Sequence, residues 1–197
     1  MDRIETSRIE TDRMVLRRFV AADWAALARF YTDDTVMRHM LAGRGLPPAE
    51  ARERAKSNIH NFNDHWARRG HGVWAVEDRG TGRLLGQCGL RWIPEAEATE
   101  LLYLFTKTVW GRGLATEAGR AVIVYAFAQT ALDRLIAVTD PQNTASQRVL
   151  GKLGFAATGP RMLWDRTVSG FELHRAQWLT GTGAAAGPHL EMSDQQV

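Results

Sequence analysis

Residues 110–118, Trp-Gly-Arg-Gly-Leu-Ala-Thr-Glu-Ala, have the composition and the setting of a turn that binds a diphosphate. Gly111, Gly113 and Ala115 leave a backbone that another molecule can approach closely. The segment lies between an apolar run and an amphipathic run, so its N–H groups are the unpaired ones of a helix start. The helix dipole adds about half a positive charge there, which favours an anion. Arg112 adds a formal positive charge at the mouth of the turn.

Other kinds of site fit the sequence less well, although an ordinary strand-to-helix connection with glycines stays an alternative for the turn. The dinucleotide fingerprint GxGxxG is absent, no acidic residue follows about 20 positions later at a strand end, and the Gly-Lys-Ser/Thr of a P-loop does not occur. The six histidines lack metal-ligand spacing, and the single cysteine, Cys88, has no local partner. We therefore expect neither a metal site nor a Cys–His nucleophile.

The apolar periodicity predicts the elements that must position this turn. The strand Thr99–Phe105 before it is apolar without alternation, which predicts cover on both faces. Further strands are predicted at 14–19, 72–78, 84–93, 135–139, 155–160 and 168–177, and helices at 23–31, from about 34, at 49–69, 115–131 and 144–153. Asp23 is the expected N-cap of the first helix. The order predicts an α/β fold of the mixed α+β kind, a mostly antiparallel sheet flanked by helices.

Composition limits the class of protein. The chain has 197 residues, enough for one domain, with 45% hydrophobic and 24% charged residues. No run approaches the roughly 20 apolar residues that span a bilayer, and the charged start has no secretory apolar region, so we expect a cytoplasmic protein and no membrane partner. The net charge of +3 is scattered, which argues against DNA or RNA as the partner.

The turn also resembles the acyl-CoA motif of the GNAT acetyltransferases, Arg/Gln-x-x-Gly-x-Gly/Ala, with Gly113 and Ala115 in its last two places. Trp110 replaces the usual Arg or Gln, as in the branch of the Rim-type ribosomal-protein N-terminal acetyltransferases. Three more segments resemble motifs of that branch in the same order, namely IETDRMVLR at 9–17, GQCGL at 86–90 and DPQNTASQRVLGKLGF at 140–155.

This resemblance covers residues 9–178 and implies a single N-acetyltransferase domain with the GNAT-type acyl-CoA N-acyltransferase fold. Residues 179–197 are small and polar and are expected to form a flexible C-terminal tail. The implied cosubstrate is acetyl-CoA.

The resemblance also implies which residues bind acetyl-CoA. Asn143 is expected to hydrogen-bond the pantetheine region. Arg148 and Lys152, one helical turn apart, either approach the 3′-phosphate or form a solvated basic face. The backbone of Leu104, Phe105 and Thr106 is expected to pair with the pantetheine arm, and the amides of Arg112, Gly113, Leu114, Ala115 and Thr116 to hold the pyrophosphate.

Amine acetylation by a thioester requires a neutral, aligned amine and protonation of the departing sulfur. By resemblance, Glu100 faces the acceptor pocket and accepts the amine's proton, directly or through a water, unless it is an exposed carboxylate at a strand end. Ser146 matches the hydroxyl acid of the Rim-type branch, unless it only caps a helix. Tyr103 and Tyr125 are the other hydroxyl candidates, and a core position is the favoured interpretation for both.

These features favour an enzyme that moves an acetyl group to a primary amine, either a protein N-terminus or a small molecule. A second class is a non-catalytic module of the same fold that binds acyl-CoA as a sensor, although the presence of both Glu100 and Ser146 argues against it. A third class, an RNA- or ribosome-associated protein, conflicts with the scattered charge. A homodimer is left open.

Overall fold

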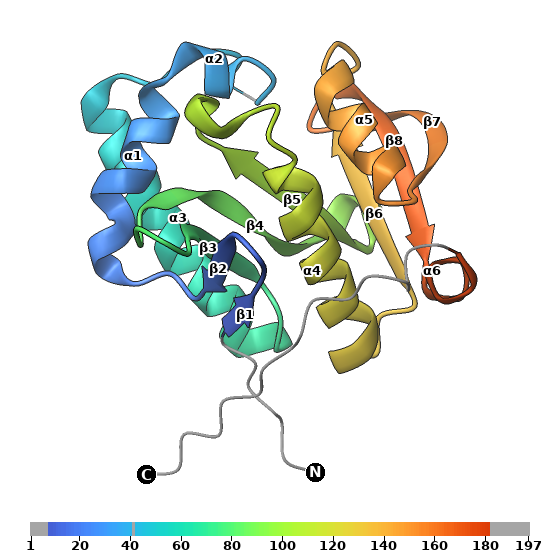
Figure 1. The fold of residues 1–197 in the computed structure, drawn as a ribbon. Coiled ribbons are helices and arrows are strands. Elements are labelled where there is room, and N and C mark those ends of the chain that lie inside the picture. Colours follow the sequence, from blue (N-terminus) through green and yellow to red (C-terminus); the bar gives the residue numbers. More distant parts are fainter. Residues whose placement is uncertain (1–7, 41, 182–197) are drawn as a thin grey trace, which may run out of the picture.

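A computed structural model describes residues 8–40 and 42–181, in which one mixed sheet carries helices on both faces (Figure 1). The strands are β1 (Arg8–Glu10), β2 (Met14–Arg17), β3 (Val73–Asp78), β4 (Leu84–Ile93), β5 (Ala98–Phe105), β6 (Arg134–Thr139), β7 (Ala156–Leu163) and β8 (Arg166–His174). The helices are α1 (Trp24–Thr32), α2 (Asp34–Met37), α3 (Pro48–Arg69), α4 (Leu114–Gln129), α5 (Thr144–Lys152) and α6 (Arg175–Thr180). This architecture confirms the expected fold class.

The sheet has the strand order β1-β2-β3-β4-β5-β6-β8-β7. Neighbouring strands run antiparallel except β5 and β6, which run parallel at the middle of the sheet. Among the described residues, the parallel strands β5 and β6 have a single register pair, Glu100↔Ile136. By contrast, every residue of β5 pairs with a residue of β4. The edge of β5 from Leu102 to Phe105 is therefore open toward β6, and a cavity lies there.

Of the three buried clusters in residues 8–40 and 42–181, the two larger ones lie on opposite faces of the sheet. The α4 side holds Leu101 and Phe105 of β5, with Tyr103 packed against them. The α1–α3 side holds Leu104 and the partly buried Leu102. Side chains of a strand alternate between faces, so Glu100 belongs to the α1–α3 side and Tyr103 to the α4 side. The cover on both faces that the apolar run indicated is confirmed.

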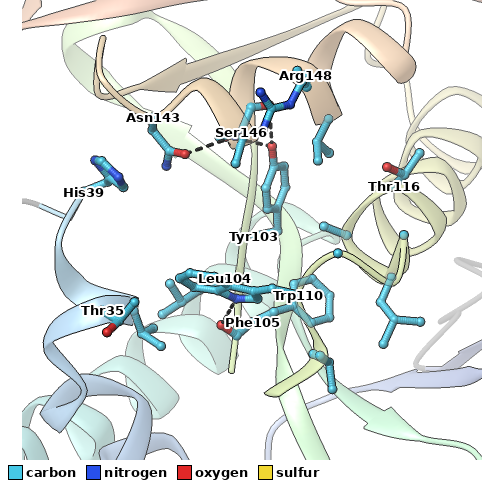
Figure 2. Close-up of a pocket in the computed structure, with 18 of the residues that line it drawn as sticks. Thr35, His39, Tyr103, Leu104, Phe105, Trp110, Thr116, Asn143, Ser146 and Arg148 are labelled. Atoms are coloured by element: carbon cyan, nitrogen blue, oxygen red, sulfur yellow. Dashed lines mark hydrogen bonds between the residues drawn. The ribbon is translucent and has the colours of Figure 1, made fainter. Parts of the chain in front are cut away.

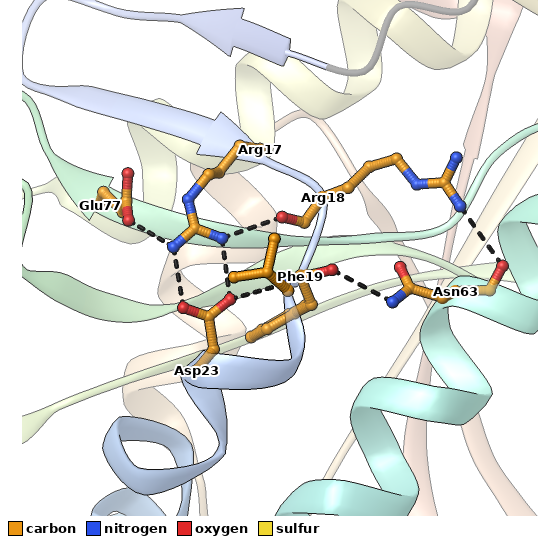
Figure 3. Close-up of polar contacts among 7 residues, drawn as sticks. Arg17, Arg18, Phe19, Asp23, Asn63 and Glu77 are labelled. Carbon is orange, nitrogen blue, oxygen red and sulfur yellow. Dashed lines mark hydrogen bonds and ion pairs between the residues drawn. The ribbon is translucent and has the colours of Figure 1, made fainter.

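An arginine on β2 joins strands β2 and β3 to the start of α1 (Figure 3). The Arg17 guanidinium donates to both carboxylate oxygens of Asp23 at 2.8 Å and to Glu77 Oε1 at 2.5 Å. Asp23 also accepts the Val20 N–H at 2.9 Å, and its side chain does not cap α1 as the sequence indicated. The carboxylate is oriented toward Arg17 because a charge-assisted bidentate pair is stronger than one cap bond.

The chain after β8 differs from the sequence expectation. The strand predicted to Gln177 ends at His174, because Arg175 donates its backbone N–H to Asp133 and its guanidinium to Leu132 and Thr130 carbonyls. That contact starts α6, which buries Trp178. The expected tail begins inside α6, and residues 182–197 lie outside the described part of the chain.

Candidate functional site

The glycine-containing turn enters α4 with the backbone geometry that the sequence indicated. Gly111 and Gly113 have φ values of 74° and 78°, a region that L side chains adopt only with strain. Gly113 immediately precedes the first residue of α4, and the Glu117 N–H donates to its carbonyl at 3.0 Å. The first backbone N–H groups of α4 are therefore available for an anion.

Two side chains fix the shape of this turn. Trp110 is about half exposed, and its indole Nε1 donates back to the Phe105 carbonyl at 2.9 Å, which closes the loop between β5 and α4. Arg13, from the turn between β1 and β2, donates to the Arg112 carbonyl at 2.9 Å and to Glu117 Oε2 at 2.7 Å. Hydrogen bonds from Trp110 and Arg13 thus hold the turn in this shape without a ligand.

A cavity of about 390 Å³ lies beside the turn, between the open edge of β5 and the first residues of α4 and α5 (Figure 2). It is lined by most of the residues that the sequence singled out, namely Leu104, Phe105, Gly113, Leu114, Ala115, Thr116, Asn143 and Ser146. Arg148 and Lys152 line it as well, which places these two cations at the cavity and not on a remote face.

Three of the expected site residues lie elsewhere. Thr106 does not line the cavity, and its N–H donates to the Leu85 carbonyl at 2.9 Å, so that amide is already used within the sheet. Arg112 lines a separate shallow hollow, together with Arg13 and Arg79. The third residue is Glu100.

Glu100 is buried at 3% exposure on the face of β5 opposite Tyr103. Its Oε2 accepts Nη2 of Arg91 at 2.6 Å and Nε at 3.1 Å. Burial raises the pKa of the Glu100 carboxyl, while Arg91 and the backbone N–H of Val138 oppose that rise. The carboxylate is therefore not exposed at a strand end, and it is not part of the described cavity with Ser146.

Ser146 lies at the start of α5 and shares its hydroxyl with a tyrosine. The Asn143 side-chain carbonyl caps the helix by accepting the Ser146 N–H at 3.0 Å, which leaves the Asn143 amide nitrogen for a ligand. The Tyr103 hydroxyl lies 2.8 Å from Ser146 Oγ and donates to the Ser146 carbonyl at 3.2 Å. Burial raises the pKa of Tyr103 to about 12, so the phenol stays a proton donor at neutral pH.

Tyr103, which the sequence favoured as a core residue, is thus a wall of the cavity (Figure 2). The residues Thr35, Arg38 and His39 also line it, from α2 and the turn that follows. Sequence analysis missed them, because a single histidine after a short helix carries no pattern that distinguishes it from a surface residue. Tyr125 lies on the buried face of α4 and donates to the Gly70 carbonyl at 3.0 Å.

Within residues 8–40 and 42–181, no group of three or more His, Cys, Asp or Glu side chains is placed to hold a metal ion. None of the helices described there is both long and apolar enough to cross a bilayer.

Comparisons with known proteins converge on one family. The family model described as an acetyltransferase (GNAT) domain matches residues 13–156. The uncharacterized protein YkkB of Bacillus subtilis (strain 168) is 33% identical over 172 residues, which are 84% of this chain and 95% of that protein. The uncharacterized N-acetyltransferase YoaA of the same organism is 32% identical over 152 residues, 77% of this chain and 84% of its own.

Among solved structures, the ribosomal L7/L12 alpha-N-protein acetyltransferase RimL in complex with coenzyme A superimposes with a TM-score of 0.70. The alignment covers 85% of this chain and 97% of RimL at 14% identity, so this likeness concerns the fold. This neighbour confirms the expected fold.

Proposed function

The chain belongs to the GNAT acetyltransferase family and is an acyltransferase, and from that premise we propose that it moves an acetyl group from acetyl-CoA to a primary amine. The observation that carries the proposal is the continuity of one cavity from the glycine turn, past the open edge of β5, to the Tyr103–Ser146 pair. We propose that the end of this cavity at the glycine turn binds phosphate and that the end at Tyr103 and Ser146 donates a proton.

The residues present suit acetyl-CoA as the cosubstrate. The first amides of α4 and the turn at Gly113 are proposed to hold the pyrophosphate, because a positive φ and a missing side chain let the anion approach the backbone. The pantetheine arm is proposed to lie along Leu104 and Phe105, with the Asn143 amide as a donor. Acetyl-CoA supplies the activated acyl group, and the related RimL structure contains coenzyme A.

Ser146 and Tyr103 are proposed to supply the proton that the departing sulfur requires. Their hydroxyls are joined at 2.8 Å, so a proton leaving one oxygen is replaced from the other. The Tyr103 hydroxyl has one hydrogen, so while it is donated to the Ser146 carbonyl the Ser146 hydroxyl donates to the Tyr103 oxygen. Transfer from Tyr103 to Ser146 requires Tyr103 to release that carbonyl. Glu100, the proton acceptor expected from the sequence, would have to act from the other face of β5, through a water or by holding the acceptor's ammonium.

The acceptor is proposed to be a primary amine, either a protein N-terminus or a small molecule. RimL is described as an alpha-N-protein acetyltransferase, so protein N-termini are among the acceptors to test. Direct transfer requires that the amine nitrogen attack the thioester carbon while the carbon–sulfur bond breaks, with both groups held in place.

A thiol-release assay with acetyl-CoA and a panel of amines tests this function. The panel contains an amino acid, a polyamine, an aminoglycoside and short peptides with free N-termini, and mass spectrometry identifies the acetylated product. We expect amine-dependent release of free thiol. Calorimetric binding of acetyl-CoA without thiol release from any amine would instead favour the non-catalytic acyl-CoA sensor, and the absence of binding would refute the cosubstrate.

A further inference from the structure

His39 lies in the turn after α2 and faces the same cavity as Ser146 and Tyr103 (Figure 2). Its side chain is 27% exposed, and its Nδ1 lies 3.6 Å from Asp140 Oδ2, at the end of β6. The other ring nitrogen, Nε2, is not engaged by Asp140. At 3.6 Å this is an ion-pair distance and not a hydrogen bond, so Asp140 places a negative charge beside Nδ1. A neutral imidazole with its hydrogen on that side has Nε2 as its proton acceptor.

Asp140 is itself held in place, which makes it a positioning residue for the imidazole. Its Oδ1 accepts the Gln142 N–H at 2.7 Å, and its Oδ2 lies 3.5 Å from Nη2 of Arg166. Arg166 also donates to the Met40 carbonyl at 3.3 Å, so the turn that carries His39 is tied to the same carboxylate. Elements far apart in the sequence thereby converge on one ring.

The charges around His39 compete with one another. Asp140 is a negative charge beside the ring, whereas several cations line the cavity or contact Asp140. These cations are Arg38, Arg148, Lys152 and Arg166. Histidine is the side chain that changes charge between about pH 5 and 8, the range in which a base must act on an amine at neutral pH.

We propose that His39, oriented by Asp140, accepts the proton of the acceptor's ammonium. This inference rests on the proposed function and deepens it. Of the two protons that the ammonium loses, one passes to His39 Nε2 and on to water. The nitrogen–carbon bond then forms as the carbon–sulfur bond breaks, and the Ser146–Tyr103 pair gives a proton to the sulfur. The second proton, lost by the nitrogen as the amide forms, returns to that pair and replaces the one it gave. Glu100 then acts through its charge on the other face of β5.

The test compares His39→Gln with His60→Gln, which removes an exposed histidine from α3. Turnover is measured from pH 5 to 9 with acetyl-CoA and the amine of the panel that the wild type acetylates fastest. We expect His39→Gln to lower kcat at pH 7 by about 100-fold or more and to lose the acidic limb of the profile, while acetyl-CoA affinity is unchanged. His60→Gln retains the wild-type profile.

A second variant separates chemistry from folding. In His39→Ala, added imidazole is expected to restore part of the lost turnover, which a purely structural role would not allow. Asp140→Asn should lower kcat by less than His39→Gln and displace the acidic limb, because the ring is still present but less well oriented. If His39→Gln retains the limb with kcat within about threefold of the wild type, the assignment is wrong.

Histidine NMR of the wild-type protein gives a readout that needs no acceptor. The His39 ring resonance, identified by its loss in His39→Gln, is expected to shift when acetyl-CoA is added. Calorimetric binding of acetyl-CoA with an unmoved His39 resonance refutes the inference and leaves the proposed function standing. A wild-type protein that binds no acetyl-CoA refutes the proposed function, and the inference falls with it.

Discussion

The phenol oxygen of Tyr103 lies 2.8 Å from the hydroxyl oxygen of Ser146, although the two residues are 43 positions apart in the sequence. One lies on the central strand β5, and the other lies in the first turn of α5. Together they give the cavity a shared pair of hydroxyls at the open edge of the sheet. The pair is the site's most direct chemical feature, and the first prediction concerns it.

Removing either hydroxyl should slow acetyl transfer without weakening acetyl-CoA binding. A thiolate is a fairly good leaving group, so we expect Ser146→Ala to lower kcat by about 100-fold, the low end for an acid–base group. Tyr103→Phe should have a similar effect, and the double variant should cost little more, because the two hydroxyls act as one donor. Ser57→Ala, an exposed hydroxyl on α3, is the control. Additive losses in the double variant would show two independent roles.

Substitution of Gly113 should separate charge from backbone strain at the turn. Asn and Asp have nearly the same shape and both tolerate positive φ better than most residues, so Gly113→Asn and Gly113→Asp differ chiefly in charge. We expect Gly113→Asp to abolish acetyl-CoA binding in calorimetry and Gly113→Asn to weaken it far less. Equal affinities of the two variants would mean that the pyrophosphate does not lie beside this residue.

Glu100→Gln should have a modest effect if His39 accepts the proton. Because Glu100 lies on the other face of β5 and is bound by Arg91, we expect kcat to fall by less than about tenfold, with any larger effect on the acceptor KM. Glu95→Gln, from the turn between β4 and β5, is the control for lost charge. A fall of about 100-fold with loss of the acidic limb would instead identify Glu100 as the base.

The Arg17 cluster should contribute to stability and not to turnover. Arg17→Met leaves Asp23 and Glu77 without their partner in a partly buried setting, and we expect the free energy of unfolding to fall by roughly 2–4 kcal/mol. Arg8→Met, which removes an exposed ion pair with Glu10, should cost less than about 1 kcal/mol. Chemical denaturation measures both, and similar losses in the two variants would contradict the role of burial.

His65 should make the protein sensitive to acid. Its Nδ1–H faces the His71 carbonyl at 2.8 Å, and its Nε2 accepts the Trp92 N–H at 3.0 Å, so the neutral ring ties α3 to β4. Burial, together with nearby arginines, lowers the pKa of His65 below its ordinary 6.5. The folded state thus binds the proton less readily than the unfolded chain. Stability is complete above about pH 6.5 and falls as the pH drops below it.

Melting curves from pH 4.5 to 8 check this dependence. His65→Gln should be less stable at pH 8 but should lose less melting temperature on acidification than the wild type. His60→Gln should follow the wild-type curve. If His65→Gln and the wild type lose the same melting temperature between pH 8 and pH 5, another group carries the acid response.

Most elements of the fold, and the turn at Gly111–Gly113, could be predicted from the sequence alone, whereas α6 could not. Both are local properties, since a positive φ and a helix start need only neighbouring residues to specify them. Glu100 and Tyr103 lie three positions apart on one strand, so the alternation of side chains along that strand also predicts that they lie on opposite faces of the sheet. The alternation does not predict which of the two faces α4 and α5 cover.

Contacts between side chains far apart in the sequence could not be predicted without the three-dimensional fold. Tyr103 contacts Ser146 because the open edge of β5 lies beside the start of α5. His39 lies beside Asp140 because the turn after α2 lies against the end of β6. These contacts depend on how the helices on the two faces pack against a sheet whose central strands, β5 and β6, diverge. That packing minimises exposed apolar area over the whole chain, so no short segment encodes it.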